Sequence, residues 1–460
     1  MPVSTSPRVT VYITNHNYAN YLGRAVDSVL SQTLDNFELI VIDDGSTDNS
    51  RELIEKYAEN DKVITIFQHN KGLNVTNNIA LRAARGDYIM RLDADDWLDA
   101  HALEILGGAL DRDPDLGLVF PDYYLVDEAG EVLEAVRRHD FDNVTLHDQP
   151  AHGACTMIRR SFLLEIDGYD ENFRCQDGYD LWIRFIKHFK VQNINLPLFY
   201  YRQHEASLTR DENRILDTRA EIIKRQAKLD RQKISALAII PVRGPAANPS
   251  SVALTPLGGK YLIDWTIQEA LEADCIKDVI VTTPDAAIIK HVDNVFGGTV
   301  ICVERDSKLA RPNTYIEGAL LDAMETYGRN NDLPDTIVHL SIRSPFRTAR
   351  HINTAVDMLH LFETDTVIAV RPETDIFFQH DGNGLVPVRK VSRLQLEREG
   401  IFREVGGLRV IRREFLEKEK SNLGGRIGHV ILDQKAALNL NSELDWKTAE
   451  SLVSEHQTNA

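Results

Sequence analysis

The sequence predicts an α/β protein built from two units, each a mostly parallel sheet with helices on its faces, joined by a charged helix. Strand-like and helix-like segments alternate at short spacing from residue 9 onward. A highly charged stretch then occupies residues 211–233, and the alternation begins again at residue 234. A length of 460 residues suits two or three domains. We therefore expect a first domain at 1–210, a helical linker at 211–233 and a second domain at 234–460.

The elements of the first half follow from apolar periodicity. Short runs rich in β-branched residues predict strands, and apolar residues every three or four positions predict helices. Strands are expected at 9–14, 37–42, 62–67 and 88–92, with helices between them at 21–32, 47–59 and 73–85. Ligands of open parallel sheets bind beyond the carboxyl ends of the strands. The acidic segments DDGSTD (43–48) and DADD (93–96) both lie there.

The second half repeats this pattern after the charged stretch. Within 211–233, Ile215, Leu216, Ile222 and Ile223 have helical spacing, which predicts an amphipathic helix. A basic helix on a membrane surface is the alternative, and the interleaved acidic residues disfavour it. Strands are then expected at 236–242, 278–283 and 336–341, with helices at 261–273 and 316–327.

The composition excludes several classes of protein. A formal net charge of −18 disfavours nucleic-acid binding, which depends on Lys and Arg neutralising phosphates. The four cysteines form no CxxC pair, so neither a zinc site nor a disulfide framework is indicated. The N-terminus lacks a signal-peptide pattern, and no apolar run reaches the ~18 residues that span a bilayer. We expect a cytoplasmic protein whose membrane contact, if it has one, is peripheral.

An Asp-x-Asp pair, Asp93 and Asp95, follows the strand at 88–92. Two hard oxygen ligands this close suit Mg²⁺ or Mn²⁺, which leaves other coordination positions for water and phosphate oxygens. A bound ion would allow a diphosphate to lie where bare carboxylates repel it. The alternative is a solvated acidic turn in which Asp96 or Asp99 caps a helix.

Four segments of the first half together resemble the inverting family 2 glycosyltransferases, which have the GT-A fold. The segments are VTVYITNHNYANYLGRAVDSVLSQT, FELIVIDDGSTDNS, NKGLNVTNNIALRAARGDYIMRLDADDWL and GYDENFRCQDGYDLWIRF, and they cover roughly residues 7–210 in the family's order. The resemblance implies that Thr14 and Asp44 contact the nucleotide and that Asp93 and Asp95 bind the metal and diphosphate, with Asp95 the more direct ligand. A carboxylate at position 44 accepts from the N3–H of uracil or the N1–H of guanine, whereas N3 of cytosine carries no proton.

The resemblance also assigns the general base and a late motif. Asp177 lies where the family places the carboxylate that takes the proton of the acceptor hydroxyl. His204, in YYRQHEASLT, is by this resemblance a diphosphate contact or a third metal ligand, and the alternative is a histidine of a surface loop. Two departures stand out: Asn77-Asn78 replaces a frequent Arg-Asn pair, which removes one positive contact to the diphosphate, and Gly178 is an extra residue beside the base.

The second half resembles the cytidylyltransferases that activate acylneuraminate and related acidic sugars, which have a nucleotidyltransferase fold. The matching segments are ALAIIPVRG, PLGGKYLIDWTIQEAL, SPFR, GGRIGHVIL and SELDWKTAE. Both halves are then Rossmann-like nucleotide-binding domains. Of the family's phosphate-binding turn, only Arg243 and Gly244 remain, with Ala247 at its lysine and Val252-Ala253 at its Lys-Asn pair. Its metal-binding Asp-x-Asp is replaced by Asn439-Leu-Asn441, and a neutral amide oxygen compensates none of the ion's charge.

These observations predict a metal-dependent inverting glycosyltransferase that moves a sugar from a nucleoside-diphosphate donor, with UDP favoured, to a hydroxyl acceptor. The acceptor would be a glycan, lipid-linked or protein acceptor of bacterial surface glycan or glycoprotein synthesis. Its second domain is expected to lack catalysis and to be a candidate site of homo-oligomer formation. Two alternatives stay open: a bifunctional enzyme whose second half makes a CMP-activated acidic sugar, and a non-catalytic scaffold or binding protein.

Overall fold

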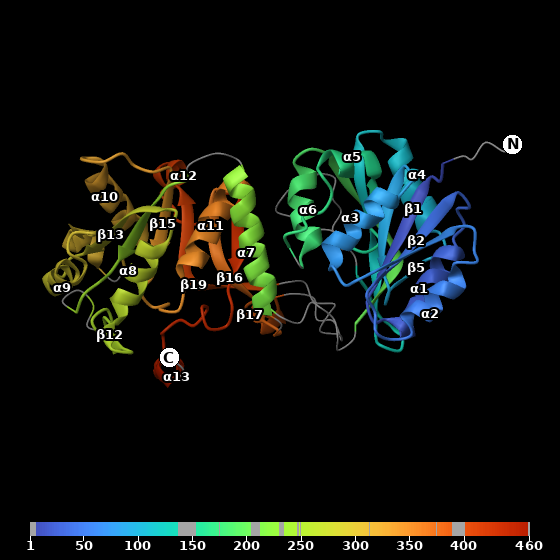
Figure 1. Ribbon diagram of the computed structural model, residues 1–460. Helices are drawn as coiled ribbons and strands as arrows, with labels where there is room; N and C mark the ends of the chain where they lie inside the picture. The colour runs from blue at the N-terminus through green and yellow to red at the C-terminus, as the bar shows by residue number, and fades with distance from the viewer. Residues whose placement is uncertain are drawn as a thin grey trace. The chain divides into compact units, whose positions relative to one another are not determined.

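The structure is a computed structural model that describes residues 6–136, 153–173, 175–203, 212–229, 234–245, 248, 250–311, 313–373, 375–388 and 401–458. The chain divides into two compact units, one within residues 1–211 and the other within residues 212–460 (Figure 1). Each unit is built on its own mixed sheet.

The sheet of the first unit has the strand order β3-β2-β1-β4-β8-β6-β9-β5, and β7 pairs with β6. The first four strands in this order are parallel, whereas β8 runs antiparallel to both β4 and β6. Its strands are β1 (Val9–Asn15), β2 (Phe37–Asp44), β3 (Val63–Gln68), β4 (Tyr88–Asp93), β5 (Trp97–Leu98), β6 (Leu116–Val126), β7 (Val132–Val136), β8 (Met157–Arg159) and β9 (Lys190–Arg202).

Helices cover both faces of this sheet, as alternating side chains of the strands require. Val11 and Ile13 of β1 join a core with Leu22 and Val26, whereas Tyr12 joins a second core on the other face. One face is covered by α1 and α4, and the other by α3, α5 and α6. The helices are α1 (Ala19–Leu30), α2 (Ser50–Tyr57), α3 (Leu73–Ala83), α4 (Ala102–Arg112), α5 (Arg160–Glu165) and α6 (Asp177–Ile186).

The sheet of the second unit has the order β14-β13-β10-β15-β19-β16-β20, with β19 antiparallel to its neighbours. Its strands are β10 (Ala236–Pro241), β13 (Ile276–Thr283), β14 (Val300–Glu304), β15 (Thr336–Leu340), β16 (Thr366–Glu373), β19 (Ile401–Arg412) and β20 (Ile427–Ile431). Two small hairpins lie outside it, β11 (Pro256–Leu257) with β12 (Lys260–Tyr261) and β17 (Phe378–His380) with β18 (Leu385–Pro387). The helices are α7 (Glu212–Leu229), α8 (Leu262–Glu272), α9 (Ala286–Phe296), α10 (Ile316–Gly328), α11 (Ala349–Leu361), α12 (Arg413–Glu419) and α13 (Glu443–Thr458), with a 3₁₀ turn, η2, at Ser307–Ala310.

All the strands and helices expected from the sequence are present, with small differences at their ends. The α/β class is confirmed, but the sheets are mixed, because antiparallel strands such as β8 and β19 extend the parallel part. The elements that the structure adds include α9 and β14, which lie between two predicted elements. Asp285 caps α9 by accepting from the backbone N–H groups of Ala287 and Ile288.

The charged helix between the halves packs on the second unit. The apolar side of α7 buries Ile222 and Ile223, and the helix lies against α11. Its apolar stripe therefore faces protein rather than a membrane surface. Among the described residues, no helix combines the length and the apolar character needed to cross a membrane.

Candidate active site

The predicted nucleotide and metal residues meet at one edge of the first sheet. The parallel strands β2, β1 and β4 are neighbours, so their carboxyl ends lie side by side. In this register Thr14 pairs with Asp93 on one side and with Ile42 on the other. Asp44 ends β2 at the same edge. The fold thus brings together Thr14, Asp44 and Asp93, which are far apart in the sequence.

Asp44 is buried and organises the turn that leads into α3. Its Oδ1 accepts from the Lys71 backbone N–H at 2.8 Å and from Gln68 Nε2 at 2.7 Å, and its Oδ2 accepts from the Gly72 backbone N–H at 2.9 Å. Gly72 has φ 88°, a backbone conformation that L-residues with a side chain rarely adopt. Since a carboxylate has about four acceptor positions, these three bonds leave capacity for one more donor.

Arg91 of β4 contacts two of the predicted acidic residues at once. Its Nε lies 2.9 Å from Asp93 Oδ1, and its Nη1 forms a close ion pair with Asp177 Oδ2. The Arg91 side chain is only 7% exposed, whereas that of Asp93 is 28% exposed. Burial raises the pKa of Asp93 to about 6; the negative charges of Asp95 and Asp177 add to this shift, and the positive charge of Arg91 opposes it. The candidate base and the first carboxylate of the Asp-x-Asp pair are therefore both paired with one guanidinium.

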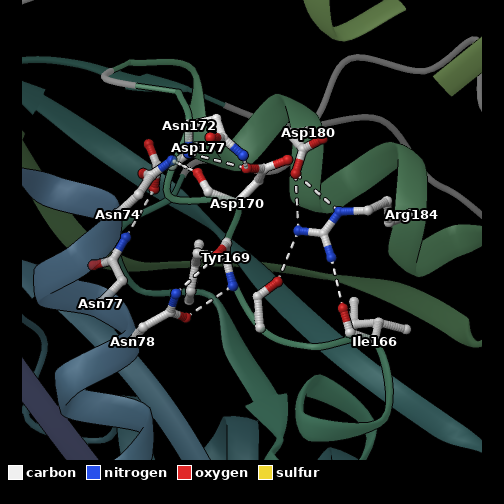
Figure 2. A network of polar contacts seen from close by, with 11 residues as sticks. Asn74, Asn77, Asn78, Ile166, Tyr169, Asp170, Asn172, Asp177, Asp180 and Arg184 are labelled. Atoms are coloured by element: carbon white, nitrogen blue, oxygen red, sulfur yellow. Dashed lines mark hydrogen bonds and ion pairs between the residues drawn. The ribbon is translucent and has the colours of Figure 1, made fainter. Parts of the chain in front are cut away.

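Asp177 begins α6 after Gln176, which has the left-handed φ of 60°. The same oxygen that meets Arg91, Oδ2, also accepts from Asn77 Nδ2 at 3.3 Å (Figure 2). Asn77 Oδ1 in turn accepts from the Tyr12 hydroxyl at 3.2 Å. The added Gly178 thus leaves Asp177 facing α3, with Oδ2 held by two donors.

Asp180 has a different environment one turn further along α6. Its Oδ2 pairs with the Arg184 guanidinium at 2.8 Å, and the same guanidinium donates to the carbonyls of Ile166 and Gly168 (Figure 2). Asp180 is 1% exposed. It anchors the helix to the turn before it, the structural role that its place at the helix start suggests.

Arg202 at the end of β9 shapes the Asp-x-Asp loop. Its backbone N–H donates to Asp96 Oδ1 at 2.9 Å, and its Nε donates to the backbone carbonyl of Asp95 at 3.0 Å. The other oxygen of Asp96 is buried without a hydrogen-bond partner among the described residues. Burial raises the pKa of Asp96 well above its ordinary value, and Asp95 and Asp93 add to the shift. This loop concentrates negative potential, which a cation would relieve.

The metal hypothesis fits the donors at this edge. Asp93 and Asp95 supply hard carboxylate oxygens, and both side chains are partly exposed. Within the described part of the chain, no three or more His, Cys, Asp or Glu residues are grouped to hold an ion. A two-carboxylate site of this kind draws its other ligands from water and substrate phosphates. The predicted third ligand, His204, lies outside the described residues.

In the second unit, the predicted Arg243 lies beside a second arginine. Arg243 Nη2 donates to the Thr314 carbonyl at 3.2 Å, and Arg305 Nη2 donates to the Val242 carbonyl at 2.6 Å. Arg305 is buried, and its Nε and Nη1 lack partners among the described residues. Burial lowers the pKa of Arg305 to about 10, and the charge of Arg243 adds to this effect. Two neighbouring cations, one of which has unsatisfied donors, favour an anion beside Arg305 and Arg243.

Several residues of the second unit replace the catalytic groups of the cytidylyltransferase family, and most of them have packing or hydrogen-bond contacts within this unit. Ala253 is buried in the main core of the second unit, and Val252 packs on a smaller core. Asn439 Oδ1 is buried without a partner in the described chain. Asn441 uses its backbone N–H to contact Asp445. Ala247 lies outside the described residues.

The residues that sequence reasoning missed are Arg91, Arg202 and Asn77 as a base contact. A signal existed for Arg91, because YIMRL places a charge within an otherwise apolar strand. A charge in a buried strand needs a partner, but the sequence does not show which carboxylate provides it.

Comparisons with known proteins agree with both resemblances. Residues 10–166 match the family model described as glycosyl transferase family 2, and residues 237–379 match the model described as cytidylyltransferase. Chondroitin synthase of Pasteurella multocida (strain Pm70) is 28% identical over 286 residues, which cover 61% of this chain and 28% of that protein. Hyaluronan synthase of Pasteurella multocida is 28% identical over 304 residues, 65% of this chain and 30% of that protein. The chain thus spans less than a third of the length of these two relatives.

One further relative and one solved structure are each similar to part of the chain. An uncharacterized glycosyltransferase of Rickettsia typhi, RT0329, is 30% identical over 217 residues, 44% of this chain and 66% of that protein. The crystal structure of Staphylococcus aureus TarS 1–349 in complex with UDP aligns with a TM-score of 0.40 and 17% identity, and covers 48% of this chain and 64% of that one.

The first unit is an α/β domain with acidic side chains at its parallel strand ends, and its sequence matches a glycosyltransferase family. More particularly, residues 10–166 match glycosyl transferase family 2, and residues 237–379 match the cytidylyltransferase family. Both predicted resemblances are confirmed at the level of the family.

Proposed function

We propose that the chain is a metal-dependent inverting glycosyltransferase that moves a sugar from a nucleoside-diphosphate sugar to a hydroxyl acceptor. The observation that carries the proposal is the pairing of one buried guanidinium, Arg91, with both Asp93 and Asp177. It joins the acidic loop at the end of β4 to the carboxylate at the start of α6. A donor diphosphate at that loop would bring its anomeric carbon toward the candidate base.

Each residue has a distinct part in this reaction. Asp93 and Asp95 would hold Mg²⁺ or Mn²⁺, which supplies the positive charge that stabilises the leaving diphosphate. Asp177 accepts the proton of the acceptor hydroxyl while that oxygen forms a bond to the anomeric carbon. The bond from the anomeric carbon to the diphosphate oxygen breaks on the opposite face, so the configuration inverts. Thr14 and Asp44 contact the nucleotide.

The donor and the product are inferred from chemistry and from the relatives. Asp44 has acceptor capacity for one further N–H, which suits uracil or guanine but not the N3 of cytosine, and we favour UDP. The names chondroitin synthase and hyaluronan synthase favour a glycan product. We place the enzyme in the bacterial cytoplasm, in surface glycan or glycoprotein synthesis, with at most peripheral contact to the membrane and with a glycan, lipid-linked or protein acceptor.

The second unit is proposed to be non-catalytic. Its Asn439-Leu-Asn441 segment carries no charge to hold a divalent ion, and the loss of cationic side chains weakens binding of a triphosphate. One observation favours the bifunctional alternative, namely the unsatisfied N–H groups of Arg305 beside Arg243. A second unit that binds an anion but does not catalyse a reaction explains both the uncharged Asn439-Leu-Asn441 segment and the unsatisfied N–H groups of Arg305.

A thermal-shift screen tests the donor and the second unit together. UDP with Mn²⁺ at roughly 100 times its dissociation constant should raise the melting temperature by about 5 °C or more, because binding to the native state stabilises it. UDP without Mn²⁺ should raise it less. CTP with Mg²⁺ and acidic sugars should release no pyrophosphate, and release would establish the bifunctional alternative. If no nucleoside diphosphate raises the melting temperature in the presence of Mn²⁺, the chain is a scaffold or binding protein rather than a transferase.

We also propose that the second unit forms a homo-oligomer. The small β17–β18 hairpin leaves Phe378 53% exposed and Leu385 70% exposed, and an isolated two-stranded hairpin is marginal in water without a partner. Light scattering of the protein should give at least a dimer mass. The double variant Phe378→Ser, Leu385→Ser should shift it to the monomer, whereas Leu444→Ser, which changes another exposed leucine, should not. A monomeric wild-type protein at micromolar concentration would contradict this proposal.

A further inference from the structure

We propose that Arg91 is a positioning residue that turns Asp177 so that Oδ1 faces the acceptor. Arg91 and Asn77 both contact the other oxygen, Oδ2. This inference rests on the proposed function, because it presupposes Asp177 as the base. It assigns a role to an arginine whose side chain is buried within strand β4.

Burial and charge explain why a cation is needed here. Asp93 and Asp177 approach the same guanidinium, and their side chains are 28% and 11% exposed. Two carboxylates this close to each other in a poorly solvated site repel, and one of them would turn away or take up a proton. Arg91 removes that conflict, since its positive charge lies between them.

The shape of the side chain matters as much as its charge. A guanidinium is planar and spreads its charge over three nitrogens, so Nε lies 2.9 Å from Asp93 Oδ1 in an ion pair while Nη1 donates a hydrogen bond to Asp177 Oδ2. A lysine ammonium on a flexible stem does not fix two carboxylates in one geometry. Gly153 makes room for this plane, because a Cβ at that position would overlap the Nη2 of Arg91.

The remaining contacts fix the rotation of Asp177. Asn77 Nδ2 lies 3.3 Å from Oδ2, and Asn77 Oδ1 accepts from the Tyr12 hydroxyl, which lies 3.3 Å from the Tyr169 hydroxyl. All of these residues are buried. Among the described residues, no hydrogen bond to Oδ1 of Asp177 accompanies those to Oδ2. Oδ1 is thus the oxygen that can accept the proton.

The test measures UDP release from the UDP-sugar that gives the largest thermal shift, with Mn²⁺ and free monosaccharides as acceptors. Arg91→Met should lower kcat by roughly 30- to 100-fold, no more than the loss of the general base itself, because Asp177 is still present but held less firmly. At saturating Mn²⁺ the donor KM should change by less than about threefold, because Arg91 contacts Asp93 and Asp177 rather than the donor itself. Arg91→Lys should fall between Arg91→Met and the wild type. Adding Asn77→Arg to Arg91→Met should recover at least about tenfold in kcat, because position 77 faces the same oxygen.

Arg184→Met is the matched control, since Arg184 also forms a mostly buried ion pair on α6 but with Asp180. Its melting temperature should fall, while its kcat per folded molecule stays within about threefold of the wild type. If Arg91→Met does not fold, the same kcat measurement is made with Arg91→Lys and Gly153→Ala. Gly153→Ala keeps the charge of Arg91 but displaces its guanidinium.

Two results would overturn the inference. The first is a kcat for the position 91 variants equal to that of Arg184→Met. The second is a raised donor KM with unchanged kcat, which would make Arg91 a donor-binding residue. The proposed function is tested by a different outcome. If Asp177→Asn transfers sugar at the wild-type rate, Asp177 is not the general base. If Asp177→Asn is inactive and Arg91→Met is fully active, Asp177 stays the base and only the positioning role of Arg91 is wrong.

Discussion

Asp177→Asn is expected to lower kcat for sugar transfer by about 10²- to 10⁴-fold, the contribution of a general base. The amide has almost the size of the carboxylate but does not accept the proton of the acceptor hydroxyl. Binding of the donor nucleotide should persist, because Asp177 contacts α3 and β4 rather than the end of β1 or β2. UDP release with monosaccharide acceptors gives the rate, and the UDP-induced thermal shift gives the binding.

Asp180→Asn controls for loss of stability in this experiment. Asp180 is also a buried, ion-paired carboxylate on α6, and its replacement leaves Arg184 without its charge partner. We expect a lower melting temperature together with a kcat near that of the wild type. A wild-type rate for Asp177→Asn would assign the base to another group.

Removal of the metal or of its main ligand is expected to have the second large effect. EDTA should abolish transfer, and Mn²⁺ should restore it. Asp95→Asn should lower kcat by at least roughly 100-fold and raise the half-activating Mn²⁺ concentration at least tenfold, because a neutral amide compensates none of the ion's charge. Transfer depends on the metal because negative charge develops on the leaving diphosphate. Without a cation, the nearby carboxylates of the acidic loop would repel that charge.

The matched variant is Asp99→Asn, which makes the same change in the same acidic segment. Asp99 Oδ1 accepts from the backbone N–H of His101, a bond that an asparagine retains. Its Mn²⁺ dependence should equal that of the wild type. Equal activity of Asp95→Asn and wild type at limiting Mn²⁺, or transfer that persists in EDTA, would show that the Asp-x-Asp pair does not hold a catalytic ion.

These experiments separate the parts of the site that the sequence could reveal from those that it could not. Thr14, Asp44 and Asp93 were predictable as neighbours, because parallel strands place their carboxyl ends along one edge. Asp177 follows no strand of this edge and became a candidate through the family resemblance alone. Its approach to Asp93 through Arg91 depends on where α6 packs against α3, a contact that no local pattern encodes.

The second unit shows the same division. The replacements Ala247, Val252-Ala253 and Asn439-Leu-Asn441 are visible in the printed sequence, and they suffice to predict a weakened triphosphate site. Arg305 could not be predicted as a neighbour of Arg243. Arg243 follows β10 and Arg305 follows β14, and only the sheet order β14-β13-β10 brings their charges together.

By itself, the sequence determined the α/β class, the two units and the acidic strand ends, because apolar periodicity and chain order follow from local residue types. The tertiary structure alone decided which charges share a site, namely that Arg91 pairs with both Asp93 and Asp177. It also decided that the backbone N–H groups of the turn before α3 donate to Asp44 and that α7 packs on the second unit. The physical reason is that pairing between charges depends on distance and burial, and both are set by the packing of elements that are remote in the chain.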